Sequence, residues 1–317
     1  MPDRPRLHPD AQAILDRIAA SGEPPMETMT AQQARAIADE RVLGASFTRR
    51  EGVATQESEA TGPNGPVPVR IYRPQSRQRG NELPILIYYH GGGMVLGSIE
   101  TVDPHCRWLC LELDCMVVSV GYRLAPEYKF PAGADDAFAA ALWVQDNAKA
   151  IGGDASRIAI AGESSGGTLA ASVCIELRNS SRPMPRLQIA IYPVMDASFD
   201  WESWRRLGQG YFLTLPKMQW FMRHYLRSAA DEADPRASPL RAARHDGLPP
   251  ALIITGGFDP LVDTGKAYAD KLRSSGIEVD YRCFEQWPHG FFYWGHSSAA
   301  QETMRLCIDR IRRAWTA

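Results

Sequence analysis

The sequence contains no block of like charges: its 35 Lys and Arg are nearly balanced by 37 Asp and Glu, and the net charge is −2. Nucleic acids and anionic membrane surfaces attract strongly basic proteins, and this composition does not provide such a charge. We therefore expect neither nucleic acid nor a membrane as a partner. The function must lie in local groups of residues instead.

Long hydrophobic runs are also missing. The longest, such as residues 84–89 and 116–120, are far too short to span a bilayer and are typical of buried strands. The charged residues at the start of the chain precede no apolar segment of the kind found in a secretory signal. The sequence therefore predicts a cytoplasmic protein.

Cysteine is scarce, with six in 317 residues. Cys106 and Cys110 lie four positions apart in a predicted helix and have a spacing that metal ligands can have. However, no second Cys or His pair stands nearby at the spacing of a zinc site. We expect reduced structural thiols, as in cytosolic proteins, and no metal site.

What the sequence does contain is a regular alternation of apolar strands and amphipathic helices from about residue 52 onward. Strands are predicted at 67–72, 85–89, 116–121, 158–161, 187–192, 251–255 and 279–284, and helices at 104–113, 134–151, 165–177, 262–274 and 299–315. Apolar strands separated by helices indicate an α/β fold with a mostly parallel central sheet covered on both faces. Ligands bind such a sheet beyond the carboxyl ends of its strands.

Two segments fall outside this alternation. Helices at 9–20 and 30–45 precede every predicted strand, and the segment 197–248 lacks a good strand but is rich in aromatic residues. A long insertion between two strands is usually functional. We predict that residues 1–50 form an N-terminal helical cap segment and that 51–317 form the catalytic domain, into which 197–248 is inserted as a second cap segment.

The aromatic residues of this insertion have two interpretations. Most of them are expected to fill the small core of the cap itself. One or two that face the pocket would be enough to shape it. Trp201, Tyr211 and Phe212 are the candidates for such substrate contacts.

Residues 162–167 read Gly-Glu-Ser-Ser-Gly-Gly between a predicted strand and a predicted helix. This is the G-x-S-x-G pattern in the strand–turn–helix context of a nucleophile elbow. A sharp turn lifts the serine above the sheet, and small neighbours let the chain turn there. Backbone N–H groups at the start of the following helix can stabilise a developing oxyanion. Ser164 is therefore the candidate nucleophile.

His90-Gly91-Gly92-Gly93 follows the strand predicted at 85–89. Three glycines let backbone N–H groups turn toward a ligand without a Cβ in the way. This element forms part of the oxyanion hole in lipases and esterases. A plain glycine-rich turn is the simpler alternative, whereas a phosphate-binding loop is excluded because no Lys-Ser/Thr pair follows.

The remaining requirement is an acid and a base, in the chain order Ser, then Asp or Glu, then His. Asp259 and His289 each lie just beyond a predicted strand end, on the rim where Ser164 is expected. The imidazole would take the proton of the serine hydroxyl, which is a weak nucleophile at neutral pH, and the carboxylate would orient the imidazole. Asp263 is the alternative acid, although it is better placed to cap the following helix, and His296 is the alternative base.

Together these motifs resemble those of the hormone-sensitive-lipase family, family IV of the bacterial esterases, which has the α/β-hydrolase fold. The resemblance covers roughly residue 71 to the C-terminus, and the N-terminal helices match only in character. It implies a two-part helical cap over an α/β-hydrolase core, no cofactor, frequent homodimers, and hydrolysis of esters of short or medium acyl chains. The matching segments, in order, are 90–93, 122–127, 130–132, 162–167, 259–261 and 289–291.

The same resemblance implies that the amides of Gly92, Gly93 and Ser165 hold the oxyanion. The sequence departs from the family pattern beside the nucleophile, where Glu163 and Ser165 stand in place of the usual aspartate and alanine. Ser165 still supplies its main-chain N–H. Met94 replaces the large aromatic residue that often follows the glycines, and it should contact the substrate and make the acyl side of the pocket more pliable.

The expected function is therefore that of a carboxylesterase, which acts on small-molecule esters through an acyl-enzyme intermediate. The same three residues serve any acyl transfer, so amide, lactone, carbonate and carbamate hydrolysis remain open. A ligand-binding receptor is the alternative from a different class, because plant gibberellin receptors resemble this family but have lost the catalytic histidine. The presence of Ser164, Asp259 and His289 argues against a receptor, and the short tryptophan-rich cap argues against a lipase that acts on emulsified fat.

Overall fold

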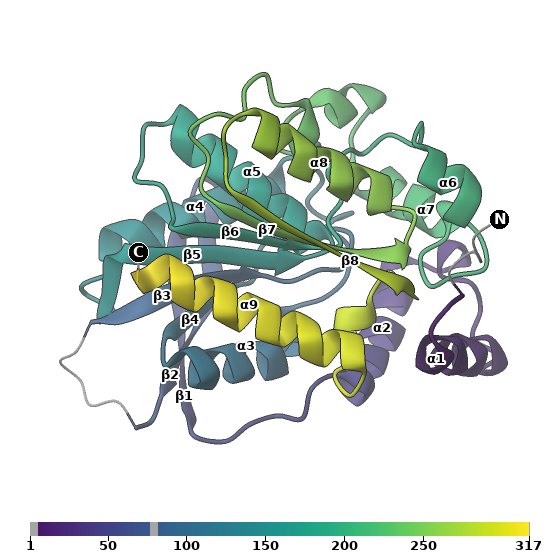
Figure 1. The fold of residues 1–317 in the computed structure, drawn as a ribbon, viewed down its shortest axis with the longest axis horizontal. Coiled ribbons are helices and arrows are strands. Elements are labelled where there is room, and N and C mark those ends of the chain that lie inside the picture. The colour runs from purple at the N-terminus through teal and green to yellow at the C-terminus, as the bar shows by residue number, and fades with distance from the viewer. Residues whose placement is uncertain (1–5, 77–81, 317) are drawn as a thin grey trace.

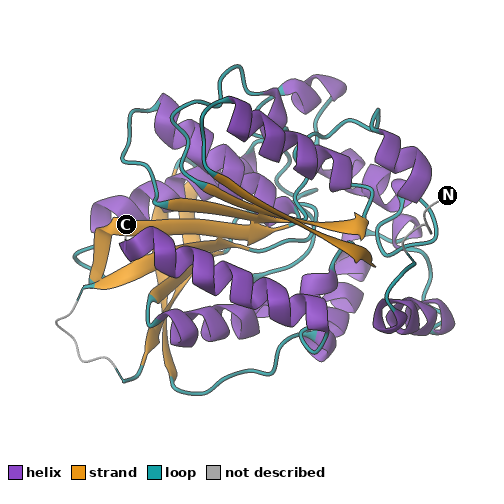
Figure 2. Cartoon of the chain, in the orientation of Figure 1, coloured by secondary structure: helices purple, strands orange, loops and turns teal. Residues whose placement is uncertain are grey.

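The computed structural model describes residues 6–76 and 82–316. Its centre is one eight-stranded sheet with the strand order β1-β2-β4-β3-β5-β6-β7-β8 (Figures 1 and 2). β2 pairs antiparallel with β1 and with β4, and the other neighbouring strands are parallel. The strands are β1 (Val53–Gly62), β2 (Gly65–Pro74), β3 (Leu83–Tyr89), β4 (Met116–Val120), β5 (Gly153–Glu163), β6 (Leu187–Ile191), β7 (Ala251–Phe258) and β8 (Val279–Pro288).

Helices cover both faces of the sheet. They are α3 (Ile99–Leu113), α4 (Ala132–Asn147), α5 (Ser165–Asn179), α8 (Val262–Ser274) and α9 (Ser298–Thr316). α3 and α9 pack on one face, and α4, α5 and α8 pack on the other (Figure 1). The predicted α/β fold with a mostly parallel, helix-flanked sheet is therefore confirmed. None of the described helices is long and apolar enough to cross a membrane.

Strand β3 shows how the two faces of the sheet are filled. Ile85, Ile87 and Tyr89 belong to the hydrophobic core on the side of α4 and α5, whereas Leu86 and Tyr88 belong to the core beneath α3 and α9. Successive side chains of a strand point to opposite faces, so a strand that is buried on both faces is apolar throughout. The central strands stand out in the sequence for this reason.

Four further helices lie beyond the carboxyl ends of the parallel strands (Figure 1). They are α1 (Pro9–Ala20), α2 (Ala31–Ala45), α6 (Glu202–Leu207) and α7 (Leu215–Tyr225). The N-terminal helices and the insertion touch each other, because α7 packs on the short helix η1 (Met26–Thr28) and Trp220 Nε1 donates a hydrogen bond to Met29 O at 3.1 Å. Two distant parts of the chain thus meet over the carboxyl edge of the sheet.

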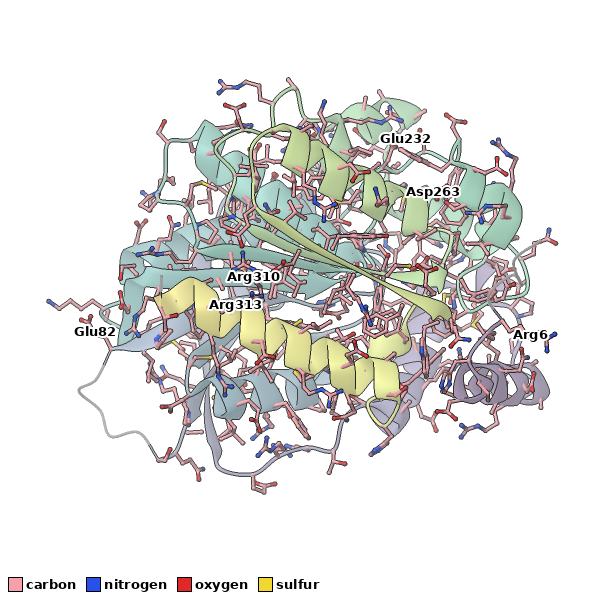
Figure 3. The ribbon with its side chains drawn as sticks, viewed as in Figure 1. Arg6, Glu82, Glu232, Asp263, Arg310 and Arg313 are labelled. Carbon is pink, nitrogen blue, oxygen red and sulfur yellow. The ribbon has the colours of Figure 1, made fainter. Side chains whose placement is uncertain are left out.

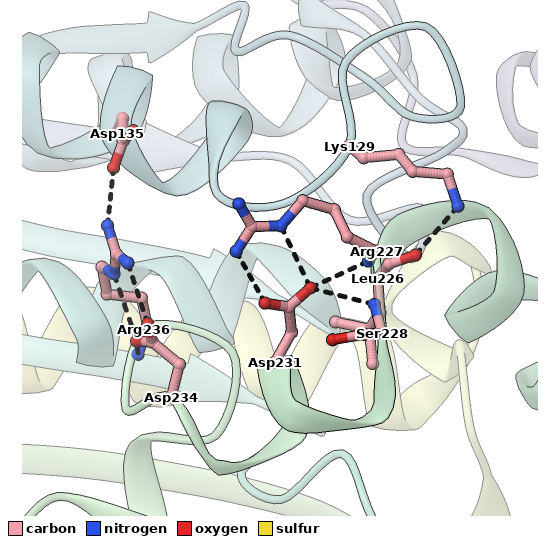
Figure 4. A network of polar contacts seen from close by, with 8 residues as sticks. All are labelled: Lys129, Asp135, Leu226, Arg227, Ser228, Asp231, Asp234 and Arg236. Carbon is pink, nitrogen blue, oxygen red and sulfur yellow. Dashed lines mark hydrogen bonds and ion pairs between the residues drawn. The ribbon is translucent and has the colours of Figure 1, made fainter.

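Polar contacts within the insertion and between it and helix α4 are shown in Figure 4. The Asp231 carboxylate accepts a hydrogen bond from the backbone N–H of Arg227 at 2.9 Å and pairs with the guanidinium of the same residue at 2.7 Å. Arg236 pairs with Asp234 in the insertion at 2.8 Å and with Asp135 of α4 at 3.0 Å. The pairs of Arg227 with Asp231 and of Arg236 with Asp234 hold the segment after α7 together, and the pair of Arg236 with Asp135 fixes it against α4.

Several bounds differ from the sequence-based prediction, such as the end of α4 at Asn147 instead of residue 151 and the start of β5 at Gly153 instead of residue 158. Two further differences have a clear physical reason. The prediction omits β1, which forms an outer edge of the sheet and is mostly exposed and polar, so that it lacks the apolar alternation of a half-buried strand. Helix α3 begins at Ile99, not at residue 104, because Pro104 lies inside the helix instead of in its first turn.

Candidate active site

Ser164 stands between β5 and α5 in a backbone conformation that residues with a side chain rarely adopt, with φ 54° and ψ −122°. The surrounding chain leaves no room for side chains at the two flanking glycines. A Cβ on Gly162 would lie 2.3 Å from the carbonyl carbon of Gly166, and a Cβ on Gly166 would lie 2.0 Å from Tyr89 O. The Gly-x-Ser-x-Gly spacing is therefore a steric requirement of the turn that presents Ser164 at the carboxyl end of the sheet.

The structure brings Ser164, His289 and Asp259 together in one hydrogen-bonded chain. Ser164 Oγ lies 3.0 Å from His289 Nε2, and His289 Nδ1 lies 2.7 Å from Asp259 Oδ2. The three residues follow β5, β8 and β7, and all three are buried, Asp259 completely. A serine, an imidazole and a carboxylate in this order can activate the hydroxyl as a nucleophile.

Neighbouring groups hold the acid and the base in place. The backbone N–H of Leu261 donates to Asp259 Oδ1 at 2.9 Å, which leaves Oδ2 to face the imidazole. The ring of His289 packs against the ring of Tyr192, with a centroid separation of 4.6 Å. Both side chains are thus fixed by contacts that are independent of the Ser164 hydroxyl.

The alternative acid and base lie elsewhere. Asp263 is in the first turn of α8 (Figure 3), where its carboxylate accepts a hydrogen bond from Ser203 N at 2.8 Å and so links α8 to α6. His296 is exposed at the surface. Neither residue contacts Ser164 or His289.

The glycine-rich loop after β3 faces the serine with free amides. Within the described part of the chain, the backbone N–H groups of Gly92, Gly93 and Ser165 donate no hydrogen bond. The amide of Gly91, in contrast, donates to Glu163 Oε1 at 2.6 Å. Three amides, and not that of Gly91, are therefore available to an oxyanion.

Glu163 is completely buried beneath this loop. Its Oε1 also accepts a hydrogen bond from the Tyr293 hydroxyl at 3.0 Å, while Oε2 has no hydrogen-bond partner among the described residues. Burial raises the pKa of Glu163 to about 7, and the hydrogen bonds from Gly91 and Tyr293 oppose this shift. Glu163 departs from the family pattern in the sequence, but only the structure shows that it supports the glycine-rich loop.

His90 braces the same loop. Its Nδ1 lies 2.7 Å from Gly91 O, its ring stacks on the Tyr122 ring at 4.3 Å, and the Tyr122 hydroxyl donates to His90 O at 2.7 Å. Burial lowers the pKa of His90 to about 4, so the imidazole is neutral at pH 7. These contacts make His90 a structural residue of the loop and not a second base.

A cavity of about 100 Å³ lies above Ser164 and His289. The loop at 91–97, helix α2 and helix α7 form its walls. Its apolar lining consists of Met26, Ala38, Val42, Leu96, Val194, Phe212, Leu213, Met218, Phe221 and Leu261. An acyl chain that is attached to Ser164 would be enclosed by these side chains.

Of the four residues expected to contact substrate, Phe212 lines the cavity, whereas Met94, Trp201 and Tyr211 do not. Met94 follows the glycines with φ 63°, and its side chain is buried in the hydrophobic core. Trp201 immediately precedes α6 and packs against the same core. The ring of Tyr211 packs on that of Phe258 at 5.1 Å. These packing contacts occupy the three side chains outside the cavity.

The sequence did not reveal three charged residues of the cavity wall, which are Asp39 and Arg41 of α2 and Lys217 of α7. The sequence contains one indication that Lys217 shares a helix face with Phe221. Thr214 caps a helix that has proline in its first turn, and Lys217 lies one turn before Phe221 on the same face. Only the packing of α7 over the sheet shows that this face borders the cavity.

Comparison with known proteins places the chain in a family. A family model described as the alpha/beta hydrolase fold matches residues 86–293. The carboxylic ester hydrolase LipN of Mycobacterium tuberculosis is 44% identical over 248 residues, which are 75% of this chain and 65% of LipN. The ethyl acetate hydrolase of Pseudomonas putida is 37% identical over 314 residues, which are 97% of this chain and 99% of that enzyme. The chain thus spans slightly less than two thirds of LipN but nearly all of the Pseudomonas enzyme.

Solved structures give the same result. An ester hydrolase from the metagenome of Lake Arreo, in complex with a bipyridine phosphonate derivative, superposes with a TM-score of 0.94 at 37% identity over 98% of this chain and 100% of the other. A hyperthermophilic esterase from the archaeon Pyrobaculum calidifontis superposes with a TM-score of 0.91 at 36% identity and the same coverage. Together with the site geometry, these similarities show that the chain belongs to the hormone-sensitive-lipase family of α/β-hydrolase-fold esterases and is a serine ester hydrolase.

Proposed function

We propose that this protein is a carboxylesterase for esters of short to medium acyl chains, with Ser164 as nucleophile, His289 as general base and acid, and Asp259 as the residue that orients the imidazole. The observation that carries the proposal is the hydrogen-bonded chain from Ser164 through His289 to Asp259 beside an apolar cavity. The similarity to an ethyl acetate hydrolase over nearly the whole chain supports a short acyl group.

The reaction follows from the positions of these groups. With its Nδ1–H donating a hydrogen bond to Asp259, His289 takes the proton of the Ser164 hydroxyl on Nε2 while Oγ attacks the ester carbonyl carbon. The amides of Gly92, Gly93 and Ser165 stabilise the negative charge on the former carbonyl oxygen. His289 then donates its Nε2 proton to the leaving alcohol as the C–O bond breaks. A water molecule that His289 deprotonates hydrolyses the acyl-enzyme, which releases the acid and restores Ser164.

The cavity walls support a limit on acyl-chain length. Because α2 and α7 close the space above Ser164, we take residues 1–50 and 197–248 as the two parts of a cap over the catalytic domain. The rings of Phe212 and Phe221 enclose the cavity within the second part. We expect activity to be highest with acetate to hexanoate esters and to fall for longer chains.

Hydrolysis of p-nitrophenyl esters from acetate to palmitate tests this function. We expect Ser164→Ala to lower kcat by roughly 10,000-fold or more. Ser165→Ala is the matched control and retains most of the activity, because Ser165 contributes its backbone amide. Mass spectrometry of the quenched reaction should find the acyl group on the peptide that contains Ser164.

Two results would contradict the proposal. Full activity in Ser164→Ala would remove Ser164 as the nucleophile, and a maximum with palmitate would remove the limit on chain length. Matched amides and lactones in the same assay determine which acyl compounds the enzyme prefers.

A further inference from the structure

Lys217 places an ammonium group on the wall of the active-site cavity. It lies in the first turn of α7 and borders the same cavity as Ser164 and His289. Its Nζ donates a hydrogen bond to Phe212 O at 3.2 Å and lies 4.3 Å from the centroid of the Phe212 ring. No carboxylate of the described residues forms an ion pair with it. An ammonium group has three N–H donors, so this contact leaves donors for a ligand.

The other charged groups near this wall belong to Glu23, Glu27, Asp39 and Arg41. Arg41 is paired with Glu23, and Glu27 on η1 is the carboxylate that acts on the Lys217 charge. Asp39 lies on α2, and burial raises the pKa of its carboxyl group. Burial, and to a lesser extent Arg41, lower the pKa of Lys217 to about 8, so Lys217 is predominantly charged at pH 7.

Lys217 stands where the active-site cavity meets a second one. Met26, Ala38, Arg41 and Lys217 line both the cavity above Ser164 and a neighbouring cavity between the N-terminal helices and α7. The ammonium group is therefore at the boundary of the reaction space. Because the contacts of Lys217 Nζ are with Phe212 and not with Ser164 or His289, we take this boundary to face the remote end of a bound ester and not its reacting carbonyl.

We propose that Lys217 binds a carboxylate at the end of the substrate remote from the scissile ester, so that half-esters of dicarboxylic acids are a preferred substrate class. A charged donor in a partly buried, apolar-lined cavity interacts more strongly with an anionic acceptor than the same donor does in water. The inference rests on the proposed esterase function and adds to it a discrimination between anionic and neutral esters.

The test compares monoethyl succinate with ethyl 4-methylpentanoate, its neutral isostere, in which an isopropyl group replaces the carboxylate. The measured quantity is the ratio of kcat/KM for the half-ester to kcat/KM for the isostere. Because Lys217→Met removes a charged hydrogen bond, we expect the ratio to fall about tenfold or more, mainly through KM for the half-ester. Lys217→Arg keeps the charge and should keep the ratio within about threefold of the wild-type value.

Two controls separate this effect from a general loss of structure. Lys266→Met makes the same substitution at an exposed lysine on α8 that pairs with Asp270, and it should leave the ratio unchanged. In the wild-type protein the ratio should also fall toward that of Lys217→Met above about pH 9, because the ammonium group then loses its proton. Circular dichroism establishes that each variant is folded.

The outcomes distinguish this inference from the proposed function. If the wild-type protein hydrolyses both esters and folded Lys217→Met has the same ratio, the inference is wrong and the esterase function stands. If the wild-type protein hydrolyses neither ester nor p-nitrophenyl acetate, the proposed function is wrong. A ratio that falls in Lys217→Met but not in Lys217→Arg or Lys266→Met supports the carboxylate site.

Discussion

The sharp turn at Ser164 requires a residue without a side chain at position 166. In Gly166→Ala the new methyl group would lie 2.0 Å from Tyr89 O, a backbone atom of a central strand that cannot move aside easily. We expect this variant to lose activity and roughly 2–4 kcal/mol of unfolding free energy. Gly44→Ala is the control, because a Cβ there meets nothing within 4 Å, and it should gain about 0.5 kcal/mol in α2. Equal stabilities of the two variants in urea would contradict the steric argument.

The free energy of unfolding should depend on pH through the buried carboxyl group of Glu163. Its pKa is raised from 4.5 to about 7 by burial, so the folded state favours the protonated carboxyl group. This contribution to stability is fully present below pH 4.5 and is lost as the pH rises through 7. A shift of this size corresponds to roughly 3 kcal/mol.

Glu163→Gln removes the titration and isolates this effect. The unfolding free energy of the wild-type protein minus that of Glu163→Gln should fall by roughly 3 kcal/mol between about pH 4 and pH 8. Urea denaturation of both proteins across this range measures the difference, in which the titration of other groups largely cancels. A difference that stays constant with pH would show that Glu163 does not carry the raised pKa.

At the level of elements, one arginine attaches helix α2 to the core. Arg35 Nε donates to Val95 O and Nη2 donates to Ala125 O, both at 2.8 Å, and the guanidinium pairs with Glu127 through two hydrogen bonds. Val95 follows the glycine-rich loop, and α2 carries part of the cavity wall. Arg35 therefore links the wall of the cavity to the loop that faces Ser164.

Two variants separate the contacts of Arg35. Arg35→Met loses all of them and should lower the unfolding free energy by about 1–3 kcal/mol and raise KM, because the cavity wall is no longer fixed. Glu127→Gln keeps both carbonyl contacts. It weakens an ion pair whose carboxylate side chain is 53% exposed, so it should cost less than about 1 kcal/mol. Urea denaturation and ester kinetics measure both, and a larger effect in Glu127→Gln would mean that the ion pair is the main attachment.

The sequence predicted those elements whose physical causes are local. β3 and β4 are buried on both faces and therefore apolar, and the turn at Ser164 needs glycines at fixed spacing, so all of them appear as patterns in the chain. β1 could not be recognised in this way, because an exposed edge strand has no apolar pattern.

The supporting contacts of the site depend on residues that are distant in the sequence. Glu163 meets Gly91 and Tyr293, which lie 72 and 130 positions away along the chain. Lys217 borders the cavity only because α7 folds back over the carboxyl edge of the sheet. No spacing within the sequence indicates such contacts, so the reacting residues and Phe212 could be predicted, while the support of the loop by Glu163 and the place of Lys217 in the cavity wall could not.

For the whole molecule, the near balance of acidic and basic residues predicts weak sensitivity to salt. A net charge of −2 creates little field to steer a substrate, and a neutral ester would not respond to one. We expect kcat/KM for p-nitrophenyl acetate to change less than about twofold between roughly 0.05 and 0.5 M NaCl. A change of fivefold or more would indicate that salt acts on the folded structure itself.

The three proposed catalytic residues follow three different strands, β5, β7 and β8. Ester hydrolysis therefore reports whether these strands have folded together. A one-residue slip between β7 and β8 would turn the side chains of one strand to the opposite face and separate His289 from Asp259. Colour release from a chromogenic ester during refolding therefore cannot begin until these strands have paired in their native register. A simple optical assay can thus time the assembly of this half of the sheet.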